Sequence, residues 1–179
     1  MLVVNYFPGS RGDTIISQLS GLPSSVDNLN RTIIDYPYDI KYVEFYNKSI
    51  DEQKLIFSQT VVPFLENNGI IGAHRFNKLN YRDFDNRITV ISIDPTSAID
   101  QVAQWYDNKV FDVFGHGDQV INSILEKTNK DLKHIRFRKD IERWTKENIL
   151  DTDVILDLKK YLDNPEYLNE FKSYYSKSS

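Results

Sequence analysis

The sequence predicts an α/β protein of three layers, in which helices cover both faces of a mainly parallel sheet. Three short apolar runs, at residues 2–7, 69–73 and 87–93, have the length of buried strands. The first and third runs lead through turn residues into helical patterns, and such alternation requires right-handed crossovers between parallel strands. The chain has 179 residues, of which 40% are hydrophobic, which is enough for one core. We therefore expect a single domain over residues 1–179.

Composition narrows the classes of partner and the location. The net charge is −4 and the isoelectric point is near 5.4, which disfavours binding to extended nucleic acid. The absence of cysteine excludes disulfides and a thiolate nucleophile. The amino terminus lacks the positively charged segment with which a secretory signal peptide begins. No apolar run approaches the ~18 residues of a membrane-spanning helix. We expect a cytoplasmic protein without a membrane partner, and the oligomeric state stays open.

Two helices are predicted in the first half of the chain. Apolar residues recur at helical spacing within residues 13–19, and Gly21 is placed to end that helix. Residues 22–39 are rich in Ser, Asn, Asp and Pro, which indicates a loop or a brief extended piece. Residues 49–67 begin with a Ser-x-x-Glu capping pattern and continue as a helix. Pro63 is expected to kink or divide it.

Helical patterns also follow the third strand. Asp94 and Pro95 suit the N-cap and the first position of a helix. The apolar positions of this helix are Ala98, Val102, Trp105 and Tyr106. Beyond Gly117 the pattern is helical almost to the end, and residues 154–162 form one of its helical runs. Asn164-Pro165 separates a last short helix, so the carboxyl-terminal third is predicted to be helical.

A phosphate-binding turn is predicted after the first strand, because α/β folds bind ligands at the carboxyl ends of parallel strands. Two glycines allow the backbone to approach a ligand closely, and the positive end of the next helix dipole lies there. Ser10 and Thr14 supply hydroxyl donors, and Arg11 can pair with a phosphate. The expected contact residues are Gly9, Ser10, Arg11, Gly12, Asp13 and Thr14. An ordinary turn with Asp13 as the N-cap is the alternative.

His74 and Arg75 directly follow the second strand. A histidine at this position can act as a base, and Arg75 is available for an anion, whereas a structural or solvent-facing histidine is the alternative. Gly115-His116-Gly117 is either a turn or a loop that closes on a ligand, and residues 133–139 are either a solvated basic face or a lid. The histidines and carboxylates show no metal-ligand spacing, so no metal is predicted.

Together, these segments resemble the sulfotransferase family of P-loop proteins, which bind the sulfate donor 3'-phosphoadenosine 5'-phosphosulfate. Residues 8–14 are similar to the family's phosphosulfate-binding loop. Residues 70–76 look like the strand that ends in its catalytic base, a role that His74 would inherit, and residues 91–95 match the frame of its 3'-phosphate-binding strand. The resemblance implies a P-loop type of fold, a phosphorylated or sulfated small ligand, and a group-transfer reaction.

Two other functions are open. A divergent small-molecule or nucleotide kinase is one, although Asp13 stands where a Walker A loop requires lysine. The other is a non-catalytic module that keeps the fold and presents aromatic residues to a partner protein. The residues in question are Tyr36, Tyr38, Tyr42, Phe45 and Tyr46.

Overall fold

The structure is a computed structural model, and it describes residues 1–7, 10–21, 34–35, 39–40, 45, 47–74, 79–102, 130–149 and 152–175. The described strands are β1 (Leu2–Asn5), β2 (Ile34–Asp35), β3 (Asp39–Ile40), β4 (Ile70–Ala73), β5 (Thr89–Asp94) and β6 (Val154–Asp157). The described α-helices are α1 (Gly12–Ser20), α2 (Ile50–Ile56), α3 (Val62–Asn68), α6 (Lys130–Asn148) and α7 (Leu158–Asp163). The shorter helical segments are the π-helix η2 (Phe57–Val61) and the 3-10 helices η3 (Tyr81–Asp83), η4 (Thr96–Ala98) and η5 (Pro165–Tyr174).

These strands form one sheet in the order β2-β3-β4-β1-β5-β6. β1 lies inside the sheet, where Leu2 is in parallel register with Ile70 of β4 and with Thr89 of β5. β3 and β6 continue the parallel arrangement outward, and only β2 among them runs antiparallel to its neighbour. The prediction of a mainly parallel sheet is confirmed.

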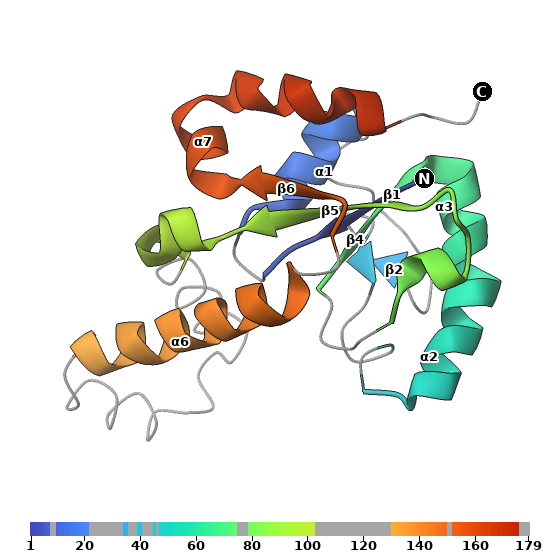
Figure 1. Cartoon of the computed structure of the whole chain (residues 1–179), viewed down its shortest axis with the longest axis horizontal. Helices are drawn as coiled ribbons and strands as arrows, with labels where there is room; N and C mark the ends of the chain where they lie inside the picture. Colours follow the sequence, from blue (N-terminus) through green and yellow to red (C-terminus); the bar gives the residue numbers. More distant parts are fainter. Residues whose placement is uncertain are drawn as a thin grey trace.

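Helices lie on both sides of the sheet: α1 and α7 on one side, and α2 and α3 on the other (Figure 1). The buried residues of α6, Ile141 and Trp144, belong to the cluster that contains α1 and α7. Alternate residues of β1 accordingly enter two separate cores. Leu2 and Val4 are buried in a cluster with α1 and α7, whereas Val3 is buried in a cluster with η2 and α3. This arrangement is compatible with the predicted three layers. None of the described helices is long and apolar enough to cross a membrane.

α1 ends where the sequence predicts, and it begins one residue earlier. Gly21 has the left-handed φ of 67° and donates its N–H to Ser17 O, which closes the last turn. The N-cap is Arg11, so Asp13 lies in the first turn and the alternative of Asp13 as N-cap is wrong. In the first turn the Asp13 carboxylate still interacts favourably with the helix dipole.

The helix predicted over residues 49–67 is divided as expected. Ser49 and Glu52 form the capping box: Ser49 Oγ accepts from Glu52 N, and Ser49 N donates to Glu52 Oε2 at 3.0 Å. The hydrogen bonds that Ser49 Oγ and Ser49 N donate to the Glu52 carboxylate hold the pKa of that carboxyl below its usual range. The π-helix η2 ends at Val61, and Pro63 follows in the first turn of α3. Proline has no N–H for the α-helical bond, and the wider π turn accommodates that loss.

The carboxyl-terminal third contains a strand, so the prediction of a helical run over residues 154–162 is wrong in its first half. β6 pairs with β5 through Val154↔Ile91 and Asp157↔Asp94, and Asp153 N donates to Val90 O at 3.0 Å. Val154 and Leu158 are four residues apart, as on a helix face, but the open edge of β5 offers backbone partners to a β-branched segment. From Leu158 onward α7 is helical, as predicted, and a 3-10 helix follows Asn164.

The remaining local predictions have mixed outcomes. Within residues 22–39, the strands β2 and β3 are the brief extended pieces, and the other positions lie outside the described residues. The N-cap of the helical segment after β5 is Pro95, so the prediction of Asp94 as N-cap and Pro95 as first helical residue is wrong by one position. Asp94 Oδ1 still accepts from Thr96 N at 2.9 Å, and helical residues continue to Val102. Phe45 is fully buried, so it cannot present its ring to a partner. The other aromatic residues named with it, and Trp105 and Tyr106, lie outside the described residues.

Candidate functional site

The carboxyl ends of β4, β1 and β5 lie side by side, because these three strands are parallel neighbours. The chain leaving β1 stays attached to β4 for one more residue, since Tyr6 N donates to Ala73 O at 2.9 Å. The segments after Asn5 and Ala73 therefore start from the same edge of the sheet. This edge is where ligands bind in open α/β sheets.

A tight turn follows β1. Ser10 is fully buried, and both its N–H and its hydroxyl donate to Phe7 O, at 3.0 and 2.6 Å. The Ser10 hydroxyl hydrogen is therefore used to hold the turn. Pro8 and Gly9 lie outside the described residues.

Arg11 and Gly12 set the direction in which α1 starts. Arg11 has φ 60°, and among the described residues other than glycine it alone has positive φ. A non-glycine residue in this region is strained, which is typical of functional turns. Gly12 lies against the face of the Tyr6 ring, so closely that a Cβ there would stand well inside 3.0 Å of the ring atoms. The first turn of α1, with Asp13 and Thr14 half-buried, is thereby packed against the end of β1.

His74 lies against the same tyrosine. Its Nδ1 is 2.9 Å from Tyr6 O, and the two rings meet edge-on with centroids 4.5 Å apart. A carbonyl oxygen can only accept, so this hydrogen bond requires the proton on Nδ1. In the neutral ring the lone pair is then on Nε2, which is the nitrogen able to take a proton.

Trp144 of α6 fixes the backbone of His74. The indole Nε1 donates to His74 O at 2.8 Å, and the indole meets the Phe7 ring edge-on with centroids 6.0 Å apart. Trp144 is only 3% exposed. One side chain of α6 thus contacts both segments that leave the sheet at this edge.

A buried polar pair joins the last residue of β1 to the neighbouring residue within β5, and the sequence did not predict it. Asn5 and Ser92 are fully buried neighbours in register, and Asn5 Nδ2 donates to Ser92 Oγ at 3.3 Å. Within the described part of the chain, nothing donates to Asn5 Oδ1. The signal that could have found the pair is an asparagine inside an apolar strand run, where asparagine is depleted.

Two aspartates at the ends of β5 and β6 accept hydrogen bonds from the helical segments that follow, and Asp157 is the N-cap of α7. Asp94 and Asp157 are in register, and Asp157 Oδ1 accepts from Ser97 Oγ at 2.8 Å and from Lys160 N at 3.1 Å. Burial works to raise the pKa of Asp157, but the hydrogen bonds from Ser97 and from the backbone of α7 outweigh it, so the pKa lies below its ordinary value. Both carboxylates are engaged in local structure.

Replacing Asp157 by alanine is expected to lower the free energy of unfolding by about 1 kcal/mol at neutral pH, as for other lost N-caps. Because its folded pKa is depressed, the contribution is complete above the unfolded pKa of ~3.9 and is lost as the pH falls through the folded pKa. Urea unfolding of the wild type and of Asp157→Ala between about pH 7 and about pH 3 measures how this stability difference changes with pH. Asp157→Asn keeps the capping acceptor and should cost less. A deficit in the alanine variant that does not shrink in acid would contradict the assignment.

The structure brings together some of the predicted site residues. Residues 10–14 and His74 meet through Tyr6, as described above. Gly9, Arg75 and His116 lie outside the described residues. In the basic segment 133–139, Arg138 pairs with Asp100 at 3.4 Å. The described residues contain no group of three His, Cys, Asp or Glu side chains that could hold a metal ion.

Fold and site together define an α/β protein with a parallel sheet, in which a helix-initiating turn and a histidine meet at the carboxyl end of an inner strand. No family model, curated protein or solved structure matches this chain. The arrangement of the site itself must therefore carry any statement about function.

Proposed function

We propose that this chain is a sulfotransferase-like transferase of P-loop type, which binds a nucleotide of the 3'-phosphoadenosine 5'-phosphosulfate class at the turn after β1. The observation that supports this most is the hydrogen bond between His74 Nδ1 and Tyr6 O. It places a candidate base beside the residue whose ring covers Gly12 at the start of α1.

The start of α1 supplies the proposed anion site. Its first backbone N–H groups have no partner within the helix, and the helix dipole adds partial positive charge at this end. Arg11 stands at the N-cap and adds a full charge for the phosphosulfate. Thr14 Oγ1 is a further donor in the first turn. We also propose Gly9 and Arg75 as residues that contact the nucleotide.

His74 is the proposed base. As Nδ1 donates to Tyr6 O, Nε2 accepts the proton of an acceptor hydroxyl. The hydroxyl oxygen forms a bond to sulfur, and the bond between sulfur and the bridging phosphate oxygen breaks. The leaving nucleotide keeps that electron pair, and Arg11 and Arg75 stabilise its charge.

Calorimetry with adenosine 3',5'-bisphosphate, the product of the donor, tests the binding site. We expect binding by the wild type and an affinity about tenfold lower for Arg11→Gln, the effect of losing one charged hydrogen bond. Arg143→Gln is the matched control, because Arg143 is an exposed arginine of α6. If the wild type did not bind the bisphosphate at millimolar concentration, the proposal would be wrong.

His74→Gln tests the base separately from the binding site. A glutamine amide can donate to Tyr6 O but cannot take a proton from the acceptor. We expect nucleotide binding to persist and sulfuryl transfer to phenolic or alcohol acceptors to fall by roughly 10²–10⁴-fold. Nucleotide binding without transfer by the wild type would favour the non-catalytic module. Thermal stabilisation by ATP with magnesium, and none by the bisphosphate, would favour a kinase.

A further inference from the structure

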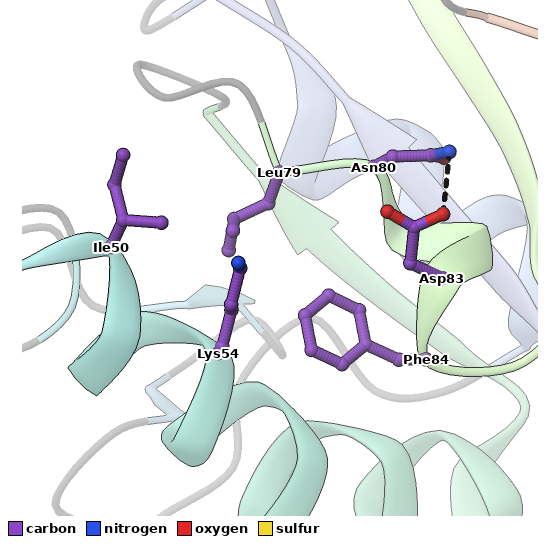
Figure 2. A pocket seen from close by; sticks show the side chains of 6 residues that line it. All are labelled: Ile50, Lys54, Leu79, Asn80, Asp83 and Phe84. Atoms are coloured by element: carbon purple, nitrogen blue, oxygen red, sulfur yellow. Dashed lines mark hydrogen bonds between the residues drawn. The ribbon is translucent and has the colours of Figure 1, made fainter.

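A pocket of about 410 Å³ opens between the start of α2 and the segment that follows β4 (Figure 2). It is lined by Ile50, Lys54, Leu79, Asn80, Asp83 and Phe84. Leu79 and Phe84 belong to the core that contains η2 and α3, whereas α1 belongs to the core on the opposite face of the sheet. The pocket is therefore separate from the turn after β1. Its size lies within the roughly 300–1,000 Å³ of small-molecule sites.

Three of the lining side chains are apolar. Leu79 is only 4% exposed, and Phe84 is held by the ring of Phe57, with centroids 4.7 Å apart. Ile50 at the mouth is 58% exposed, which is unusual for a large aliphatic side chain beside a core. A ligand with an apolar body would bury this surface against preformed walls.

The pocket also holds one cation and one anion that do not neutralise each other. The Lys54 ammonium makes no ion pair with any residue of the described ranges. Asp83 is oriented by Asn80, whose Nδ2 donates to Asp83 Oδ1 at 3.0 Å. Lys54 rises from α2 on one side of the Phe84 ring, and the Asp83 carboxylate lies on the other (Figure 2).

We propose that this pocket binds a free amino acid with an aromatic or branched apolar side chain. The ligand's carboxylate pairs with Lys54, its ammonium pairs with Asp83, and its side chain packs on Phe84, Leu79 and Ile50. A simple organic acid would satisfy Lys54 but face the Asp83 charge, and a simple amine would have the converse difficulty. A zwitterion matches both charges, and the apolar walls select its side chain.

Amide-resolved NMR titration of the 21.0 kDa chain with L-phenylalanine tests this proposal. For a small ligand in an open pocket we expect a Kd on the order of 1 mM, with shifts confined to amides of residues 50–54 and 79–84. The truncated probes 3-phenylpropanoate and 2-phenylethylamine should each bind about fivefold more weakly, because each leaves one charge of the pocket unpaired.

Two variants locate the charges. Lys54→Gln should weaken L-phenylalanine about fivefold and leave 2-phenylethylamine unchanged, and Asp83→Asn should weaken L-phenylalanine and leave 3-phenylpropanoate no weaker. Lys146→Gln, at an exposed lysine of α6, is the matched control. The proposal would be overturned if the shifts fell on other residues, or if no shift appeared at about 10 mM ligand, which is ten times the expected Kd. It would also be overturned if all three probes bound equally well, or if Lys54→Gln kept full affinity for L-phenylalanine. Because Lys54 is exposed, the Lys54→Gln variant should fold normally. The outcome of the L-phenylalanine titration does not depend on whether the chain binds a nucleotide.

Discussion

Gly12→Ala is expected to destabilise the protein by about 3 kcal/mol, at the upper end of the cost of overpacking. The new methyl group would occupy space held by the Tyr6 ring, and Tyr6 is only 6% exposed. The ring can yield only by moving against its neighbours, one of which is His74. Urea unfolding measures the loss, and the NMR signals of the His74 ring should shift because its contact with Tyr6 changes.

Gly21→Ala is the matched control for this steric cost. Gly21, unlike Gly12, has a left-handed backbone, and a Cβ there meets no heavy atom within 4 Å. Its replacement should cost only the backbone strain, about 1 kcal/mol. In a Tyr6→Ala background the added cost of Gly12→Ala should nearly vanish, since the clashing ring is gone. If both glycine variants lost the same stability in the wild-type background, the packing of Tyr6 on Gly12 would be contradicted.

Trp144→Ala is expected to cost about 3–5 kcal/mol, as for other large aromatic residues removed from cores. The change leaves a cavity beside Phe7 and removes the donor to His74 O. Since the indole contacts both segments that leave the sheet, the end of α6 should also lose protection against hydrogen exchange. Urea unfolding and hydrogen exchange of the residue 141–149 amides measure the two effects.

Trp144→Phe separates the hydrogen bond from the packing. Phenylalanine keeps most of the ring volume and loses the N–H, which leaves His74 O without that donor. We expect a cost nearer 1–3 kcal/mol, the range for a buried group left unsatisfied plus a small cavity. If the phenylalanine variant were as unstable as the alanine variant, the hydrogen bond would matter more than the packing described here.

The amino-terminal half of the fold could be predicted because its signals are local. An apolar run, two glycines and the stop at Gly21 lie within one short stretch, and each acts on its own neighbours. The division of the long helix before Pro63 was predictable for the same reason, because proline lacks the donor wherever it stands. The meeting of this turn with His74 followed from the parallel order of strands.

The missed features depend on partners distant in the chain. Residues 154–157 fit a helix by their spacing, and they form a strand because β5 presents an open edge to them. The left-handed conformation of Arg11 could not be predicted from the sequence either, since arginine has no preference for positive φ. The hydrogen bond from Asn5 to Ser92 joins residues 87 positions apart, so the asparagine within the apolar run marks a buried polar position but does not identify its partner.

The place of β1 inside the sheet also constrains how the chain can acquire its structure during synthesis. β1 leaves the ribosome before both of its neighbours in the sheet, which are residues 70–73 and 89–92. At about 5–20 residues per second, roughly 4–17 s pass before both have been made. Throughout that interval the apolar segment Leu2–Val4, fully buried in the finished protein, has neither partner. Nascent chains that pause before Thr89 should therefore be the ones most dependent on chaperones.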